Sequence, residues 1–281
     1  QALQLRGLAM ALHRAMPAAP APWSRVLVPG FDGRITGAAQ ALREARARAP
    51  VLADHAAAAA LYARKDYGGL VVQRGAVGRG LVQQMLWEAR VCRDHGWLQP
   101  HGQEADGRTD MARYMGARQA AASQLYGLAY GIALLGAVGR QLNRRRPAGA
   151  REFKPGMVQL ACYNGGGARY RVHRDGYPAE ALEAGNVPEW ARKEVMARQI
   201  TTILYLQDEW REEMGGAFRA HSAAVDFGEP PADYQDLQPS GGTLLLFRAR
   251  DLAHEVLPTA WPRFALSMWC LAAGEGRPAA R

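Results

Sequence analysis

The chain has 281 residues and a mass of 30.6 kDa, which is enough for one large domain or one domain with an extension. Its hydrophobic content of 48% and charged content of 22% are those of a globular protein and exclude a largely disordered chain. The net charge of +9 is compatible with nucleic acid or an acidic peptide, but the arginines are spread along the whole chain, so we interpret the charge as a compositional bias.

The first part of the chain is rich in alanine and arginine and is interrupted by prolines. Residues 40–49 and 52–64 are predicted to form short helices of modest amphipathicity. We therefore divide the chain into an N-terminal extension, residues 1–65, and a main domain, residues 66–281.

The main domain begins with a short strand-like run and continues with helices. We predict a strand at residues 70–72, a helix at 79–93 and a polar, glycine-rich loop at 95–108, of the kind that covers a site. Apolar residues then recur at steps of three and four from Leu125 to Leu142. This spacing indicates a long amphipathic helix.

From Arg151 onward, short β-branched or aromatic runs alternate with Gly, Pro and Asp residues. Helices followed by many short strands indicate an α+β fold, with a two-sheet, barrel-like core and helices packed on one outer face. The predicted strands are residues 157–163, 170–173, 200–206, 216–219, 243–247, 255–257 and 264–271.

The cysteines and the apolar runs indicate neither a disulfide framework nor a membrane span. Cys92, Cys162 and Cys270 are an odd number without a Cys-x-x-Cys pair. The longest apolar stretch, residues 126–139, is shorter than the ~18 residues that a membrane helix needs. Residues 1–31 contain arginines but no Asp or Glu, as transit peptides do. We expect buried thiols in a cytoplasmic or nuclear protein, with an organelle as the alternative.

Three residues of the strand-rich part have the composition of an iron site. His173 and Asp175 are two positions apart, so on a strand both side chains point to the same face. His254, far downstream, would complete a set of two imidazoles and one carboxylate. Such a set leaves coordination positions of Fe(II) open for a co-substrate and O₂. Each residue alone could equally be structural, and only the combination indicates a metal site.

Arg263 follows at the start of a strand whose alternating pattern buries one face. A guanidinium there either forms an ordinary salt bridge or is buried inside the barrel, where it requires an anionic partner. A dicarboxylate bound to the metal at one end and to Arg263 at the other would be that partner. We therefore expect an enzyme that binds iron, a dicarboxylate and oxygen and that hydroxylates its substrate.

The segments around these residues carry further motifs. They are Gln159-Leu-Ala-Cys-Tyr-Asn-Gly-Gly-Gly-Ala-Arg-Tyr-Arg-Val-His-Arg-Asp175, Arg198-Gln-Ile-Thr-Thr-Ile-Leu-Tyr-Leu206, Gly215-Gly216, Pro239-Ser-Gly-Gly-Thr-Leu-Leu-Leu-Phe247, His254-Glu-Val-Leu-Pro258 and Arg263-Phe-Ala-Leu-Ser-Met-Trp269. Their order and spacing resemble those of the 2-oxoglutarate- and Fe(II)-dependent prolyl 4-hydroxylases, most of all the oxygen-sensing, hypoxia-factor type and its bacterial relatives. The motifs cover residues 157–272, and a looser resemblance in helix order extends back to residue 66.

The resemblance implies a double-stranded β-helix (jelly-roll) core that uses Fe(II), 2-oxoglutarate and O₂, with L-ascorbate as a further candidate cofactor. It assigns the iron to His173, Asp175 and His254, and the distal carboxylate of 2-oxoglutarate to Arg263. Tyr205 would donate a hydrogen bond to the same carboxylate. The aromatic residues expected to line the co-substrate pocket are Tyr163, Tyr205 and Trp269, with core packing as the alternative role of each.

The implied reaction is C4 hydroxylation of a prolyl residue in a protein or peptide, with release of succinate and CO₂. We expect a monomer with neither a membrane nor nucleic acid as its partner. Two alternatives stay open: a dioxygenase of the same fold acting on nucleic acid or a small molecule, and a non-catalytic peptide-binding module. The segment from Asp175 to Arg198 is longer than the resemblance predicts, with small helices expected at 179–184 and 189–196, and leaves the substrate open.

Overall fold

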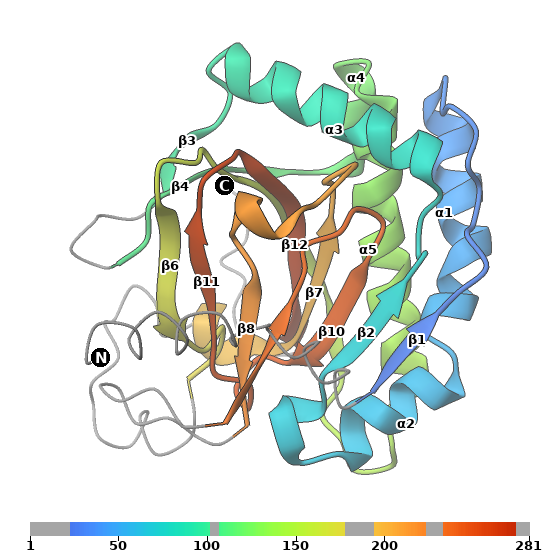
Figure 1. The fold of residues 1–281 in the computed structure, drawn as a ribbon. Coiled ribbons are helices and arrows are strands. Elements are labelled where there is room, and N and C mark those ends of the chain that lie inside the picture. Colours follow the sequence, from blue (N-terminus) through green and yellow to red (C-terminus); the bar gives the residue numbers. More distant parts are fainter. Residues whose placement is uncertain (1–22, 102–106, 178–193, 223–232, 274–281) are drawn as a thin grey trace, which may run out of the picture.

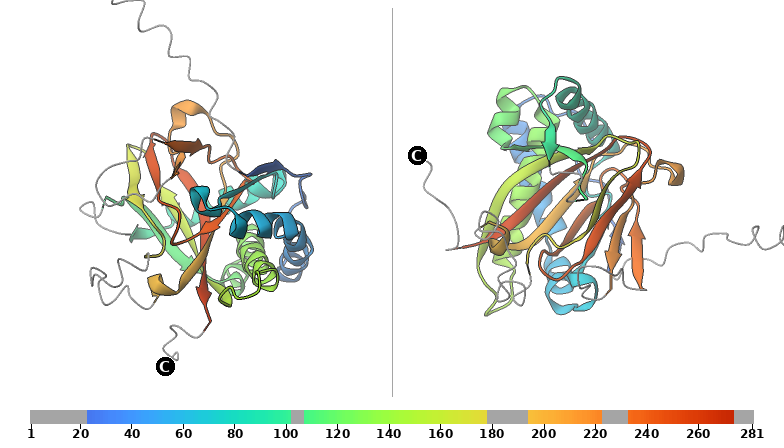
Figure 2. Two further views of the ribbon diagram at one scale, coloured as in Figure 1. Left: turned by 90° about the horizontal axis from the view of Figure 1, so that it is seen from below. Right: turned by 90° about the vertical axis from the view of Figure 1, so that its left-hand side faces the viewer.

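The computed structural model describes residues 23–101, 107–177, 194–222 and 233–273. In this part of the chain two mostly antiparallel sheets face each other, and helices gather on the outer side of the larger one (Figures 1 and 2). The architecture confirms the predicted α+β class, with helices mostly ahead of a strand-rich core. The helix expected at 179–184, and most of the one at 189–196, lie outside the described residues.

The helices begin and end close to the predicted positions. Their bounds are α1 (Ala38–Leu52), α2 (His55–Ala63), α3 (Arg79–Asp94), α4 (Ala117–Ala122) and α5 (Tyr126–Arg144), with single 3-10 turns at η1 (Asp66–Gly69) and η3 (Glu212–Met214). Asp54 starts α2, because its carboxylate accepts a hydrogen bond from the backbone N of Ala57 at 2.8 Å.

The strands form one sheet of eight and one of four. Their bounds are β1 (Ser24–Val26), β2 (Val71–Arg74), β3 (Gln99–His101), β4 (Asp110–Met115), β5 (Phe153–Tyr163), β6 (Ala168–His173), β7 (Arg198–Tyr205), β8 (Phe218–His221), β9 (Tyr234–Leu237), β10 (Leu244–Arg248), β11 (His254–Thr259) and β12 (Arg263–Ala272). The larger sheet has the order β1-β2-β10-β7-β12-β5-β4-β3 and the smaller one β6-β11-β8-β9.

One predicted loop contains a strand. β3 lies inside the segment 95–108, where it pairs with β4, and Pro100 is opposite Met111. Its sequence, Gln-Pro-His, has neither alternation nor β-branched residues, so the sequence offered no strand signal. A proline is tolerated there because β3 is the edge strand of the larger sheet.

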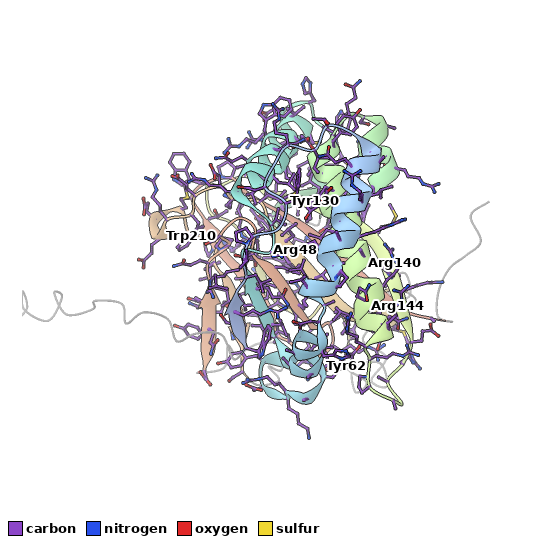
Figure 3. The ribbon with its side chains drawn as sticks, turned by 90° about the vertical axis from the view of Figure 1, so that its right-hand side faces the viewer. Arg48, Tyr62, Tyr130, Arg140, Arg144 and Trp210 are labelled. Atoms are coloured by element: carbon purple, nitrogen blue, oxygen red, sulfur yellow. The ribbon has the colours of Figure 1, made fainter. Side chains whose placement is uncertain are left out.

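Alternation along β12 separates the two faces of the larger sheet. Phe264, Leu266, Met268 and Cys270 are fully buried in the core that the sheet shares with the helices. The odd-numbered residues face the other way, toward the smaller sheet. Figure 3 shows α1 and α5 side by side over the helical face, with Arg140 and Arg144 of α5 directed away from the core.

Close packing of α5 on the sheet depends on a small residue. A Cβ added at Gly131 would lie 2.6 Å from Cδ1 of Leu266 and 2.9 Å from Sδ of Met85, so a larger residue would displace these two side chains. Gly127 also lies in a close contact, because a Cβ there would be 3.0 Å from Cγ of Gln84. In the described ranges no helix is long and apolar enough to cross a membrane. The three cysteines are free and buried, as expected.

A buried carboxylate joins α3 to the start of α5. Glu88 accepts hydrogen bonds from the backbone N of Gly127 at 3.0 Å and of Leu128 at 2.7 Å. These N–H groups have no partner within α5, so Glu88 satisfies donors that the helix itself leaves free. We expect Glu88→Ala to lower the free energy of unfolding by about 2–4 kcal/mol, because two buried donors lose their acceptor. Urea denaturation measures the change, and Glu44→Ala at a surface ion pair serves as the control; an equal loss in both variants would contradict the role of Glu88.

Candidate functional site

A cavity between the two sheets collects most of the residues that the sequence indicated. Alternate residues of β5, β7 and β12 line it from the larger sheet, and residues of β6, β8 and β11 from the smaller one. The expected site residues on its wall are His173, Asp175, His254, Arg263, Tyr163 and Trp269. Tyr205 is fully buried in the adjoining apolar cluster, beside Arg263.

His173, Asp175 and His254 form a compact triad. Nε2 of His173 lies 3.9 Å from Oδ1 of Asp175, and Nε2 of His254 lies 3.8 Å from Oδ2. One ligand atom from each residue lies within 4.8 Å of the others, and no second group of this kind occurs in the described ranges. The strand pairing explains the convergence, because β11 and β6 are antiparallel neighbours with His254 directly opposite His173.

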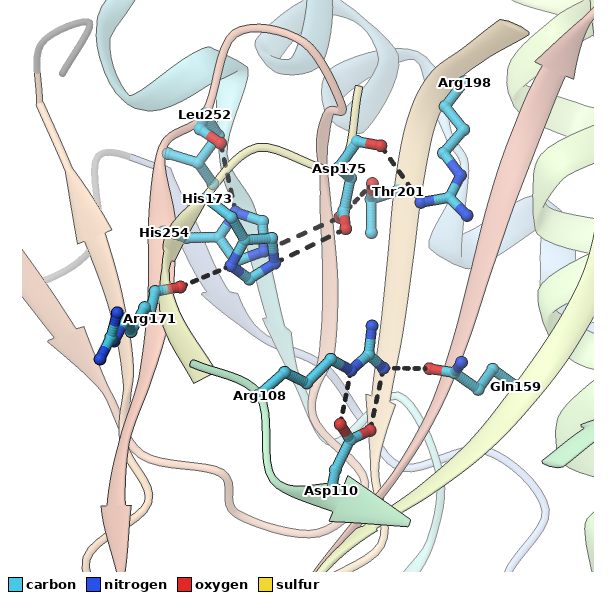
Figure 4. Close-up of polar contacts among 10 residues, drawn as sticks. All are labelled: Arg108, Asp110, Gln159, Arg171, His173, Asp175, Arg198, Thr201, Leu252 and His254. Carbon is cyan, nitrogen blue, oxygen red and sulfur yellow. Dashed lines mark hydrogen bonds and ion pairs between the residues drawn. The ribbon is translucent and has the colours of Figure 1, made fainter. Parts of the chain in front are cut away.

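Backbone carbonyls orient both imidazole rings. Nδ1 of His173 lies 2.8 Å from the O of Arg171, and Nδ1 of His254 lies 3.2 Å from the O of Leu252 (Figure 4). A carbonyl oxygen only accepts, so Nδ1 carries the proton in each ring and Nε2 offers its lone pair to the centre of the triad. Burial lowers the pKa of His173 to about 3 and also lowers the pKa of His254. Both rings are therefore neutral, as metal ligands must be.

The third member of the triad is ionised. Burial alone would raise the pKa of Asp175, but its polar surroundings lower it overall, with the charge of Arg198 and a hydrogen bond from Thr201 among the causes. Oγ1 of Thr201 donates to Oδ2 of Asp175 at 2.7 Å, which fixes the orientation of the carboxylate. Two neutral imidazoles and one charged carboxylate are a ligand set that suits Fe(II).

Thr201 is therefore expected to support metal binding without being a ligand. Thr201→Val should weaken the binding of Co(II) or Fe(II) by about tenfold, because the carboxylate loses the bond that orients it. Thr201→Ser keeps the hydroxyl and should bind like the original protein. The neighbouring Thr202, whose hydroxyl donates to the O of Met268 at 3.3 Å, provides the control Thr202→Val. Calorimetric titration with Co(II) distinguishes the variants, and unchanged affinity in Thr201→Val would rule out this support.

Arg263 forms a second polar centre in the cavity. The residue is 4% exposed, and its Cζ lies 5.3 Å from the ring centre of Tyr163 and 5.0 Å from that of Tyr205. No carboxylate of the described residues pairs with it, and Nε of Arg263 and the hydroxyl of Tyr205 have no hydrogen-bond partner. Burial raises the pKa of Tyr205 to about 12, so the hydroxyl keeps its proton. A buried cation and a free donor require an anionic ligand with oxygen acceptors.

The glycine pair before β8 makes room for this arginine. Gly216 has a φ of +70°, and a Cβ there would lie 2.9 Å from Cδ of Arg263. Both the backbone conformation and the close approach exclude larger residues. The packing around Arg263 thus explains Gly216, while Gly215 has a φ of +63° and a Cβ there would lie 2.4 Å from the backbone O of Pro258.

Trp269 lies on the face of β12 that lines the cavity, at the opposite end from Arg263. Cζ of Arg198 lies 4.0 Å from the centre of its ring, and Nη1 of Arg198 donates to the backbone O of Asp175 at 3.2 Å. The centre of the Tyr114 ring lies 6.3 Å from that of Trp269. Trp269 is therefore closer to the triad end than to Arg263, since its partner across β7 is Thr201.

Several cavity residues were missed by the sequence analysis. Gln159 and Thr201 lie an even number of positions from Tyr163 and Tyr205 on the same strands, so the strand period of two could have indicated them. No sequence pattern indicated Arg108. It precedes β4, which was not predicted, and its contact with Tyr170 is an isolated bridge between segments that are distant in the sequence.

Comparison with known proteins shows which family the sequence around this site resembles. Residues 158–271 match the model of the 2OG-Fe(II) oxygenase superfamily. Residues 158–271 are thus similar to the oxygenases of this superfamily. The residues present fit the cofactor and co-substrate of that superfamily, Fe(II) and 2-oxoglutarate, because the triad offers two imidazoles and a carboxylate, and Arg263 has no carboxylate partner among the described residues.

Solved structures with a similar fold include prolyl hydroxylases and an epimerase. A prolyl-4-hydroxylase from Pseudomonas putida is 26% identical, with a TM-score of 0.56 over 79% of this chain and 100% of that one. A Trichoplax adhaerens prolyl hydroxylase, in complex with a peptide fragment of the hypoxia inducible factor oxygen degradation domain, is 18% identical, with a TM-score of 0.60 over 78% and 90% of the two chains. The epimerase SnoN, in complex with Fe³⁺, alpha ketoglutarate and nogalamycin RO, is 19% identical, with a TM-score of 0.53 over 81% and 89%.

Proposed function

We propose that this 2OG-Fe(II) oxygenase hydroxylates a prolyl residue at C4 in a protein or peptide, releasing succinate and CO₂. The observation that carries the proposal is the presence of two centres in one cavity: the triad of His173, Asp175 and His254, and the unpaired, buried Arg263. The choice of proline is supported by the similarity to the Pseudomonas putida prolyl-4-hydroxylase over the whole of that chain.

In this proposal each centre holds one end of the co-substrate. His173, Asp175 and His254 would hold Fe(II) through the two Nε2 atoms and a carboxylate oxygen. Arg263 would bind the distal carboxylate of 2-oxoglutarate through two parallel hydrogen bonds, and the Tyr205 hydroxyl would donate a third. When bound, Fe(II) with 2-oxoglutarate and O₂ supplies the oxidising chemistry that no side chain can provide.

The walls between the two centres have a separate task. Apolar side chains from both sheets line this part of the cavity and exclude water; they are Ala161, Ile203, Phe218, Val256 and Ala265. Excluding water lowers the local dielectric and strengthens the pairing of Arg263 with a carboxylate. It also protects reactive species from side reactions with solvent.

The proposal is tested with purified protein, Fe(II), 2-oxoglutarate, L-ascorbate and a library of blocked peptides that each contain one central proline. We expect succinate to form together with 4-hydroxyproline, as read by mass spectrometry of the peptides. Succinate formation coupled to oxidation at another residue would keep the oxygenase and overturn proline as its target.

A small-molecule substrate is the second candidate, since SnoN, in complex with nogalamycin RO, shares the fold. It would be favoured if small molecules stimulated succinate formation and the peptides did not. Hydroxyproline that disappears from the proteome of cells lacking the enzyme would instead identify the protein target and exclude this candidate.

A further inference from the structure

The proposed function assigns no role to a cluster of polar side chains in and next to the cavity. Arg108 lines the cavity with its side chain 16% exposed, and the side chain of its partner Asp110 is fully buried. Nε and Nη2 of Arg108 donate to the two carboxylate oxygens of Asp110, the second at 2.9 Å. Nη2 also donates to Oε1 of Gln159 at 3.2 Å (Figure 4). The three side chains thus form one rigid unit within the cavity wall.

The amide nitrogen of Gln159 is the donor of this unit that has no acceptor. Nε2 of Gln159 is buried without a partner, whereas Arg108 has Asp110, Gln159 and Tyr170 as neighbours with which it pairs. A guanidinium only donates, so the oxygen of the Gln159 amide must face Arg108 and the NH₂ must point away from it. Arg108 and Gln159 both line the cavity that contains the triad, and Figure 4 shows them together on one side of it.

The environment of this donor indicates the ligand that it lacks. Gln159 is 2% exposed, so bulk solvent does not satisfy its amide, and a buried donor without an acceptor is destabilising. The charge of Arg108 is already balanced by Asp110 through a bidentate pair, whereas Arg263 has no such partner. The free donor therefore suits a neutral oxygen acceptor, such as an amide carbonyl, better than a second carboxylate.

The position of the Arg108–Gln159 unit relative to the triad indicates which bound molecule supplies the carbonyl. Cζ of Arg108 lies 4.7 Å from the ring centre of Tyr170, and that ring stacks on His173 with 3.5 Å between centroids. Gln159 is paired across β5 and β12 with Ser267, which lies between Arg263 and Trp269 in the cavity-facing row. The ring of Tyr170 thus lies between Arg108 and His173 of the triad, and the Arg108–Gln159 unit lies away from Arg263.

We propose that Gln159, oriented by Arg108, forms a carbonyl-binding subsite for the oxidised substrate, receiving an amide oxygen close to the carbon that is hydroxylated. The inference rests on the proposed function, because it states where the substrate of that oxygenase is held. It assigns Gln159 as a binding residue and Asp110 as the residue that positions Arg108.

The test uses Gln159→Met, which removes the donor while keeping a side chain of similar size. The protein is loaded with Mn(II) and 2-oxoglutarate under argon, and N-acetyl-L-prolinamide is titrated by ligand-observed NMR. We expect the Kd of N-acetyl-L-prolinamide to rise about tenfold in Gln159→Met, the effect of one hydrogen bond. The Kd of 2-oxoglutarate should stay unchanged. Gln159→Glu, which still accepts from Arg108 but donates nothing, should also lose affinity for the amide.

Gln141→Met is the matched control, because Gln141 accepts from Nη1 of Arg145 at 2.9 Å on α5, outside the cavity. Equal affinity of Gln159→Met and the original protein for N-acetyl-L-prolinamide would overturn the subsite, as would failure of the original protein to bind it. A rise in the Kd of 2-oxoglutarate instead would assign the donor to the co-substrate and equally overturn it. Failure of the proposed function has a different signature, which is the absence of succinate formation by the original protein with Fe(II).

Discussion

Replacing His254 with alanine is expected to reduce the turnover of 2-oxoglutarate more than a hundredfold and to abolish stoichiometric Fe(II) binding. The imidazole is 3% exposed, and its Nε2 faces Asp175, so no neighbouring residue can take its place. Residues that merely orient a ligand already change metal affinity by about 10–100-fold, and loss of a ligand must exceed that. Calorimetric titration with Co(II) measures binding, and succinate release under saturating 2-oxoglutarate measures turnover.

The control for this variant is His95→Ala, at an exposed histidine just after α3. A thermal melt of His254→Ala is also needed, because the ring packs on Phe218 with 4.9 Å between centroids. If a folded His254→Ala kept full turnover, the iron would have to be bound elsewhere. The same outcome with His173→Ala would lead to the same conclusion.

Replacing Arg263 with methionine is expected to have opposite effects on co-substrate binding and on stability. The Kd of 2-oxoglutarate should rise about a hundredfold or more, because removing one partner of a buried, hydrogen-bonded charge pair costs ~2–5 kcal/mol. Without 2-oxoglutarate the variant should be more stable by about 1–2 kcal/mol, since a buried cation without a carboxylate partner is replaced by an apolar side chain. Thermal melts with and without 2-oxoglutarate measure both effects.

Arg211→Met provides the matched control for Arg263, because Arg211 is 62% exposed and pairs with Glu213 at 3.0 Å. It should leave both the Kd and the melting temperature nearly unchanged. Arg263→Lys keeps the charge but loses the paired geometry, so its affinity should fall between those of the original protein and Arg263→Met. An unchanged Kd in Arg263→Met would remove the co-substrate role from this residue.

Most of the triad could be selected from the sequence because its chemistry is local. His173 and Asp175 share one strand end, and two residues of spacing place both on one face. His254 and Arg263 could be connected to them because the order and spacing of the motifs around them resemble those of the 2-oxoglutarate-dependent prolyl 4-hydroxylases. The period of two places His173 with Asp175, and the resemblance adds the other two residues.

The polar unit around Arg108 could not be predicted in the same way. Its position depends on the pairing of β4 with β5, which brings Met111 opposite Cys162, and on an isolated bridge between Arg108 and Tyr170. Such contacts between distant segments leave no periodic trace in the sequence. The short edge strands β1, β3 and β9 were missed for a related reason, since backbone pairing with a neighbour, rather than an apolar face, makes them strands.

The division of β12 into a helix-facing and a cavity-facing row has a consequence for how such enzymes diversify. Apolar exchanges at Leu266 or Met268 alter packing against α5, while exchanges at Ser267 or Trp269 reshape what the cavity admits. Neighbouring residues of this strand thus affect different properties. A mutation can therefore change substrate selectivity without lowering the stability of the fold. A lineage could change its substrate repeatedly through these odd-numbered positions without rebuilding its helical layer.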